Sequence, residues 1–249
     1  MKKYVILLLV SVISGCTGKK DNQQSPIKQT TVAMVVDLTD AKTLKLWPKV
    51  KSILALYHCT DFPEQSCKFS VTAISDLKTN PAYQAFLPNV LETEKSNTND
   101  DIQWRSKVIR RYYNDITKLM FWFYQENDTS INRNHSEVWE TIARSIESLV
   151  KESPSEKYLL IFSDLGEMSL TGNVYKAFQT LSIEAIVKKL TKAYAVPQNI
   201  KGVKVIVVYQ PVNREDDLRF NKMFKVYKTM LKVKGALISR QATVDQFEK

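Results

Sequence analysis

The hydrophobic pattern of the chain alternates short apolar runs with longer segments of helical spacing. Apolar runs without polar alternation are typical of strands buried on both faces of a parallel sheet. Between them, apolar residues recur every three or four positions, as on an amphipathic helix. The predicted strands are 31–36, 68–74, 157–162, 203–209 and 236–239, and the predicted helices are 44–58, 102–125, 136–151, 183–194 and 214–234.

Strands that alternate with helices of this length predict an α/β fold. We expect three layers, with a mostly parallel, doubly wound sheet and helices on both faces. Residues 30–249 are long enough for one α/β domain with a sizeable core. Residues 76–101 contain Pro81, Pro88 and a polar run, so we expect an irregular insertion there.

Two of the predicted helices have features beyond their spacing. The helix 102–125 ends in LMFWFY, which is more aromatic than one buried stripe requires. We expect core packing with the excess covering the sheet edge, whereas an exposed aromatic patch would indicate a protein contact. The helix 214–234 is followed by Gly235, where a left-handed residue can end it. Its predicted core face consists of Leu218, Met223, Phe224, Tyr227, Met230 and Leu231.

The first residues resemble the leader of a bacterial lipoprotein. Two lysines precede the apolar run Tyr4–Ile13, which is too short to span a bilayer and predicts a secretory signal. The run closes in Ile13-Ser14-Gly15-Cys16, which resembles a lipobox. The resemblance implies cleavage after Gly15, acylation of Cys16, and anchoring in a membrane by two or three acyl chains, such as palmitate. The alternative is an ordinary signal peptide, residues 1–15, with a chance cysteine.

Residues 16–29 are the lipidated cysteine and a polar segment, in which we expect a flexible tether. Thr17 stands where inner-membrane lipoproteins of enteric bacteria have aspartate, so the resemblance favours the outer membrane. The formal net charge is +10, and it becomes +8 once Lys2 and Lys3 are removed with the leader. The basic residues are scattered, so we expect a solvated surface and no nucleic-acid partner; a patch that contacts anionic lipid is the alternative.

Two cysteines remain after lipidation, Cys59 and Cys67, separated by seven residues. Outside the cytoplasm such a pair predicts a disulfide, which here would close a short loop between a helix and the next strand. The competing interpretation is a metal site that combines both cysteines with His58. That site lacks a fourth ligand nearby.

Polar residues follow two of the predicted strands. Asp37, Thr39 and Asp40 follow the strand 31–36, and Asp164 follows the strand 157–162, with Gly166 permitting a sharp exit. The carboxyl ends of parallel strands share one edge of a sheet, and ligands bind at that edge. Ser136 is the predicted N-cap of the helix 136–151, with Glu137 in its first turn, and would add a hydroxyl to this edge.

These residues resemble a von Willebrand factor A domain. That family has a parallel sheet with helices on both faces and a metal-ion-dependent adhesion site of the pattern Asp-x-Ser-x-Ser, a later Thr, and a last Asp. The resemblance implies that Asp37, Thr39, Ser136 and Asp164 are metal ligands. The sequence departs from the family pattern at Ala41, where the family has a side chain with a hydroxyl group. Oxygen ligands suit Mg²⁺ or Mn²⁺, but the incomplete site would bind weakly or not at all.

Other chemistries have less support in the sequence. The two aspartates could each cap local backbone amides without a ligand. No glycine-rich nucleotide loop is present, and the position at which a haloacid-dehalogenase phosphatase needs a second aspartate is Thr39. His135 beside Ser136 could suggest a hydrolase dyad, but neighbouring residues at a helix start seldom converge.

The leading hypothesis is a non-enzymatic, lipid-anchored binding module of the bacterial cell envelope. Its sheet edge would contact an unidentified protein partner, with a divalent ion as a possible bridge. The candidate contact residues are Asp37, Thr39, Asp40, Ser136 and Asp164. The competing hypothesis is a metal-dependent hydrolase, phosphoesterase-like, with Asp37 and Asp164 as ligands. A shallow edge would favour the binding module and a deep pocket the enzyme.

Overall fold

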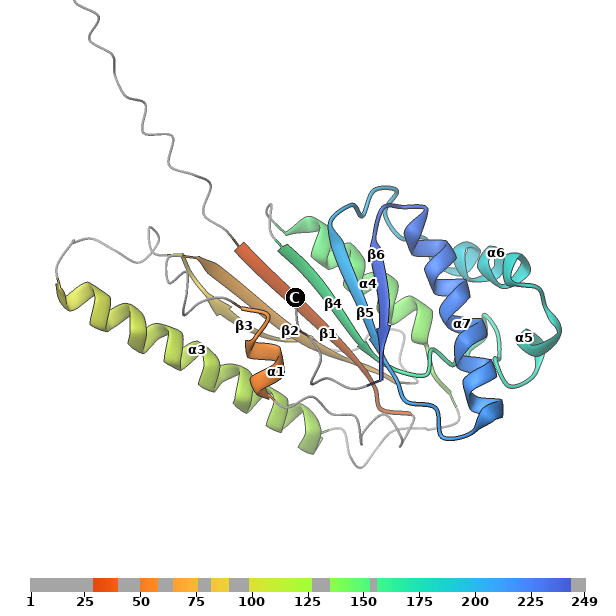
Figure 1. Ribbon diagram of the computed structural model, residues 1–249, viewed down its shortest axis with the longest axis horizontal. Coiled ribbons are helices and arrows are strands. Elements are labelled where there is room, and N and C mark those ends of the chain that lie inside the picture. Colours follow the sequence, from red (N-terminus) through yellow and green to blue (C-terminus); the bar gives the residue numbers. More distant parts are fainter. Residues whose placement is uncertain are drawn as a thin grey trace, which may run out of the picture.

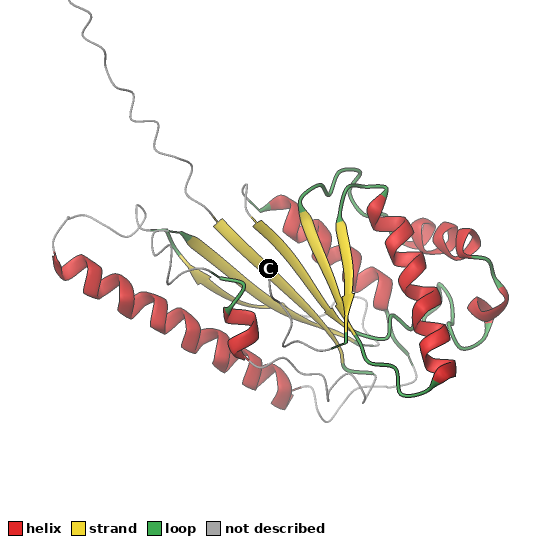
Figure 2. Ribbon diagram, in the orientation of Figure 1, coloured by secondary structure: helices red, strands yellow, loops and turns green. Residues whose placement is uncertain are grey.

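The computed structural model describes residues 29–39, 50–57, 65–75, 82–89, 99–126, 135–152 and 156–242. Its centre is a six-stranded sheet in the order β3-β2-β1-β4-β5-β6 (Figure 1). Helices cover both faces of this sheet (Figure 2). The predicted α/β architecture, with a mostly parallel central sheet, is confirmed.

Five of these strands run parallel to one another, and each lies within two residues of its predicted bounds. They are β1 (Gln29–Asp37), β2 (Ser66–Ile74), β4 (Glu156–Phe162), β5 (Val203–Val208) and β6 (Leu237–Gln241). β1 lies between β2 and β4, and helices cover both of its faces, so all but its first residue are buried. This placement explains why its sequence shows no polar alternation.

The sixth strand, β3 (Ala82–Leu87), was not predicted and lies inside the segment expected to be an irregular insertion. It pairs antiparallel with β2 and forms the edge of the sheet. Ala85 and Leu87 are buried while Gln84 and Phe86 are exposed, so its pattern is that of a strand with one covered face. The prolines in this segment, Pro81 and Pro88, flank the strand and do not interrupt it.

The helices fall into two groups, one on each face of the sheet. α1 (Val50–Leu54) and α3 (Asn99–Glu126) pack on one face, and α4 (Val138–Lys151), α6 (Ile183–Ala193) and α7 (Arg214–Lys232) pack on the other. A short helix, α5 (Ala177–Thr180), precedes α6. β1 contributes to both cores, with Val32 and Met34 toward α1 and α3 and with Ala33 and Val35 toward α4. No helix in the described ranges has the length and apolarity needed to cross a bilayer.

The predicted core face of α7 is correct except at its start. Met223, Tyr227 and Leu231 are buried as expected, but Leu218 is exposed. The buried residue in the first turn is Asp216, which accepts hydrogen bonds from the Tyr209 hydroxyl and the Val212 amide. After α7, Gly235 adopts a φ of 96°, which confirms the predicted left-handed residue.

The predicted disulfide involves one described residue. Cys67 is fully buried at the start of β2, in the core beneath α1 and α3. Cys59 and His58 lie outside the described residues, so the disulfide and the competing metal site both stay predictions.

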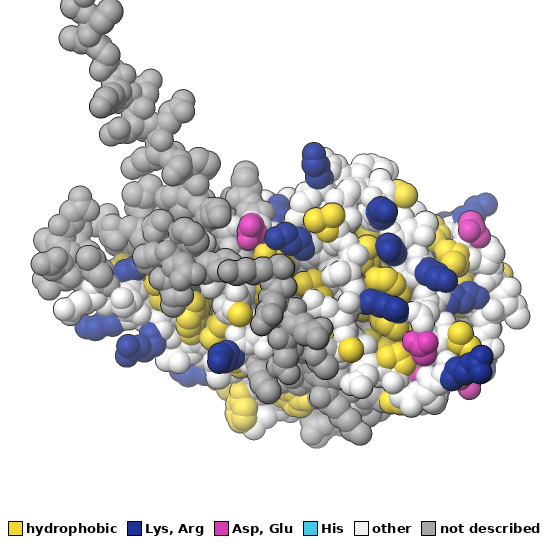
Figure 3. Space-filling view, viewed as in Figure 1, with side chains coloured by type: hydrophobic (Ala, Val, Ile, Leu, Met, Phe, Trp, Pro, Cys, Tyr) yellow, Lys and Arg dark blue, Asp and Glu magenta, His cyan; other side chains and the backbone are white. Residues whose placement is uncertain are grey.

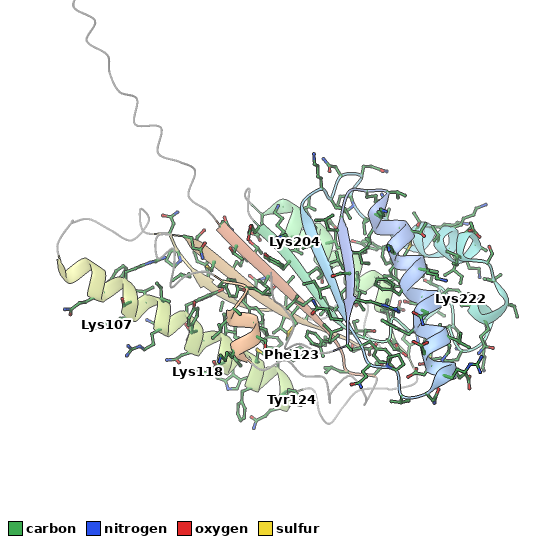
Figure 4. The ribbon with its side chains drawn as sticks, in the orientation of Figure 1. Lys107, Lys118, Phe123, Tyr124, Lys204 and Lys222 are labelled. Carbon is green, nitrogen blue, oxygen red and sulfur yellow. The ribbon has the colours of Figure 1, made fainter. Side chains whose placement is uncertain are left out.

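The aromatic end of α3 divides between the core and the surface. Phe123, labelled in Figure 4, is fully buried and packs edge-to-face on Tyr83 of β3, with the ring centroids 6.1 Å apart. Phe121 is 59% exposed and Trp122 is 55% exposed. The expectation that core packing would account for this cluster is therefore only half correct.

The two phenylalanines give a matched test of this division. Phe123→Ala should lower the free energy of unfolding by about 3–5 kcal/mol, because it leaves a cavity beneath β3. Phe121→Ala removes the same atoms from the surface, so it should change the free energy of unfolding by no more than about 0.5 kcal/mol. Urea unfolding monitored by circular dichroism measures both. Equal losses in the two variants would contradict this placement of α3.

Candidate functional site

The carboxyl ends of β1 and β4 lie side by side at the centre of the sheet edge. Val36 is paired with Phe162, so Asp37 and Ser163 are the next residues on two adjacent strands. The predicted proximity of the polar residues that follow these strands is therefore correct for Asp37 and the Ser163-Asp164 pair.

Asp37 is 1% exposed, and protein donors surround its carboxylate. Oδ1 accepts hydrogen bonds from the Thr39 amide at 3.0 Å and the Thr39 hydroxyl at 2.6 Å. Oδ2 accepts a hydrogen bond of 2.8 Å from the hydroxyl of Ser163. The Asp-x-Thr spacing thus forms a local turn around the carboxylate, which is one of the interpretations left open by the sequence.

Asp164 organises the loop that follows β4. Its Oδ1 accepts a hydrogen bond from the Gly166 amide, and its Oδ2 accepts one of 3.0 Å from the Tyr175 hydroxyl. The sharp exit from the strand uses Leu165, which is buried with a φ of 61°, a rare conformation for a residue with a branched side chain. Gly166 is required for a different reason than predicted: a Cβ there would lie 2.6 Å from Asp164 Oδ1.

Ser136 is not the N-cap of α4, and this prediction is wrong. Its amide donates to the Met168 carbonyl and its carbonyl accepts from the Met168 amide, so Ser136 lies in extended backbone one residue earlier. The N-cap is Glu137, whose side chain makes no capping hydrogen bond. The Ser136 hydroxyl is buried and has no hydrogen-bond partner among the described residues. His135 contacts Glu137 and not Ser136, so the hydrolase dyad does not form.

The cap of α4 comes from Glu167, which the sequence did not identify. Its Oε2 accepts a hydrogen bond of 2.8 Å from the Trp139 amide, one of the donors left open in the first turn of a helix. Glu167 is fully buried, and its Oε1 has no hydrogen-bond partner in the described part of the chain. Burial raises the pKa of Glu167 to about 7, although the nearby Ser169 hydroxyl and the Trp139 amide oppose this shift.

A buried tyrosine of α7 lies within the electrostatic influence of three carboxylates. The Tyr227 side chain of α7 is fully buried, and its hydroxyl has no hydrogen-bond partner among the described residues. Burial raises its pKa well above the ordinary 10, and nearby negative charges raise it further. The carboxylates responsible are Glu167, Asp164 and Asp37. We call these three residues the carboxylate cluster.

The donor set fits a divalent ion only in part. In the described ranges no group of three His, Cys, Asp or Glu side chains is placed to hold a metal. All four carboxylate oxygens of Asp37 and Asp164 accept hydrogen bonds from protein donors. Among the described residues, the buried oxygens without such donors include Ser136 Oγ, Glu167 Oε1 and the Tyr227 hydroxyl. Asp40 and Ala41 lie outside the described residues.

Three surface grooves lined by described residues lie away from this cluster. One lies between α4 and the polar face of β2 and β3, the second on the face of β5 and β6 beside α7, and the third between α6 and α7. None of the three is lined by Asp37, Ser136 or Asp164.

Comparison with known proteins identifies no family. No protein-family model and no curated protein sequence matches this chain.

The raised pKa of Glu167 predicts a specific dependence of stability on pH. A carboxyl group with a higher pKa in the folded state stabilises the fold fully below its unfolded pKa, and this contribution is lost as the pH rises through the folded pKa. For a rise from 4.5 to about 7, the loss is about 3 kcal/mol between pH 4.5 and pH 7. Glu167→Gln can still accept from the Trp139 amide, so it should lack this loss.

Chemical denaturation of the two chains across this pH range measures the difference. Groups other than Glu167 titrate equally in both, so only the difference between the chains is informative. The same slope of stability against pH in the wild type and in Glu167→Gln would contradict the raised pKa.

Proposed function

We propose that this chain is a lipid-anchored binding module of the bacterial cell envelope, held in the outer membrane by acylated Cys16. It contacts a protein partner through the carboxyl edge of the sheet. The anchor and the location rest on the resemblance of Ile13-Ser14-Gly15-Cys16 to a lipobox. The contact surface rests on the geometry of the loop that follows β4.

One observation carries the contact surface: a loop fixed by buried carboxylates presents exposed apolar side chains. Asp164 accepts from the Tyr175 hydroxyl, and Arg219 of α7 lies over the Tyr175 ring at 5.2 Å from its centroid. Leu170, which lies between Asp164 and Tyr175 in the loop, is 91% exposed. Val212 and Leu218, which follow β5 at the same edge, are also exposed. A preorganised loop loses little conformational entropy on binding.

The competing function is a metal-dependent hydrolase that uses Asp37 and Asp164. Such an enzyme needs a cavity that brings substrate to these carboxylates. Asp37 is buried beneath Thr39 and Ser163, and the three grooves described above lie elsewhere. These observations favour the binding module.

A photoreactive residue at position 170 in the intact, acylated chain should crosslink one specific envelope protein in cells. A photoreactive residue at Lys189, which is exposed on α6, is the matched control and should not crosslink it. Tyr175→Phe keeps the ring but removes a hydrogen bond to a charged group, worth about 1.5–3 kcal/mol, so the crosslink should weaken. Equal yields from positions 170 and 189, or unchanged yield in Tyr175→Phe, would exclude this edge as the contact.

The proposal includes a weak divalent-ion site formed by Asp37, Thr39, Ser136 and Asp164. A ligand that binds only the folded state stabilises it by RT ln(1 + [L]/Kd), about 2.7 kcal/mol at a hundredfold excess. Millimolar Mg²⁺ or Mn²⁺ should therefore raise the Tm of chelated protein by several degrees. Asp37→Ala should abolish the rise and Ala41→Ser should increase it, as measured by scanning calorimetry. If neither the wild type nor Ala41→Ser responds to a divalent ion, the site binds no metal, and the protein contact remains to be tested by crosslinking.

A further inference from the structure

The outer face of α3 is basic and aromatic. Trp104 is 41% exposed, and Phe121 and Trp122 are more exposed still. Between these aromatic ends the helix exposes four cations. They are Lys107, Arg110, Arg111 and Lys118, and none forms an ion pair with another described residue. Figure 3 shows Lys and Arg side chains along this helix at the lower left, without acidic side chains among them.

The spacing of these residues gives α3 two distinct faces. Trp104, Lys107, Arg111, Lys118 and Trp122 are separated by steps of three, four or seven residues, so they form one stripe along the helix. The opposite stripe is buried against β2, β3 and α1, and consists of Arg105, Ile109, Tyr112, Ile116, Met120 and Phe123. Figure 4 labels Lys107 and Lys118 on the side of α3 away from the sheet.

The two kinds of side chain on the exposed stripe have different requirements. Trp104 and Trp122 on the stripe, and Phe121 beside it, are large aromatic side chains whose exposure costs free energy in water, so a purely solvated face does not explain them. A partner protein would need acidic groups opposite four cations. A lipid surface meets both requirements, because tryptophan is favoured at the headgroup level and lysine and arginine are attracted to anionic headgroups.

The charge on this face is one-sided. Among the α3 side chains that the structure describes, the acidic one is Asp115, and it is half-buried. Among these described side chains, no exposed carboxylate opposes the exposed cations. We infer that the outer face of α3 lies against an anionic lipid surface, with the rings of Trp104, Phe121 and Trp122 among the headgroups and the cations beside lipid phosphates.

The lipid anchor in the proposed function places such a surface within reach. Residues 17–28 connect Cys16 to β1, and twelve residues extend at most about 40 Å. The contact by α3 does not depend on the protein partner at the carboxyl edge, so each can fail without the other.

The test uses the intact, acylated chain in vesicles whose lipids carry brominated acyl chains, which quench tryptophan fluorescence on contact. With phosphatidylglycerol present, Trp104 and Trp122 should be quenched, and with phosphatidylcholine alone the quenching should be much weaker. The variant Lys107→Glu/Arg111→Glu/Lys118→Glu should lose this extra quenching. These three charge reversals should weaken the contact by at least about a hundredfold, since the loss of each cation alone contributes about a factor of five.

The matched control is Lys225→Glu/Lys228→Glu/Lys232→Glu on α7, which changes the net charge equally at exposed positions. It should keep the wild-type quenching. Equal loss in both triple variants would reduce the effect to overall charge and overturn the proposal. Wild-type quenching in the α3 variant would also overturn the proposal. So would shielding of Trp104 and Trp122 that appears only after envelope proteins are added, because the contact would then be with protein.

A measurement on the wild type alone guards against variants that fail to fold. An increase in salt from about 0.1 M to about 1 M shortens the screening length from about 10 Å to about 3 Å. The extra quenching in phosphatidylglycerol vesicles should fall accordingly. Quenching that is independent of salt would contradict a contact that depends on charge.

Discussion

The hydrogen bond from the Ser163 hydroxyl to Asp37 joins the ends of the two central strands. A carboxylate that is almost completely buried must be satisfied by protein donors, because an unpaired charge there would cost several kcal/mol. Thr39 supplies the other donors, so the chain has to turn directly after β1. The same Ser163 hydroxyl accepts from the Leu165 amide, which fixes the exit from β4. One buried charge thus determines the course of both loops at the centre of the sheet edge.

The loop after β4 carries this constraint to the helices on the opposite side from α3. Glu167 reaches the first turn of α4, and Asp164 holds Tyr175 beneath Arg219 of α7. Two acidic side chains on a loop of a few residues therefore fix the position of two helices. The left-handed Leu165 is compatible with this arrangement because the surrounding contacts determine its conformation. The result is a rigid edge on which Leu170 is the most exposed large apolar side chain described.

The sequence predicts the parts of this fold that follow from local periodicity. The buried strands are correct, and so are four of the five predicted helices and the placement of Asp37 and Asp164 after adjacent strands. The predicted helix 44–58 is helical at Val50–Leu54 only within the described part, and residues 55–57 are not helical. The errors concern tertiary contacts. Ser136 has the residue type of an N-cap, but Glu167 supplies the capping oxygen from another loop, and no local pattern encodes that contact. β3 is short and half-covered, so its apolar signal is weak. Glu167 and Tyr227 become recognisable only when the fold brings them together.

The two proposed surfaces constrain each other through the direction of α3. Arg105 near its start donates to the Pro88 carbonyl just after β3, and Phe123 near its end packs on Tyr83 near the start of β3. α3 is therefore antiparallel to β3 and runs in the same direction as β2 and β1, as Figure 1 shows. If the outer face of α3 lies on a bilayer, the strands run parallel to the membrane plane. Their carboxyl ends then point along the membrane surface and not away from it. A partner that binds the Leu170 loop would then have to stand beside the domain at the same membrane, so the lipid contact would restrict which envelope proteins can reach it.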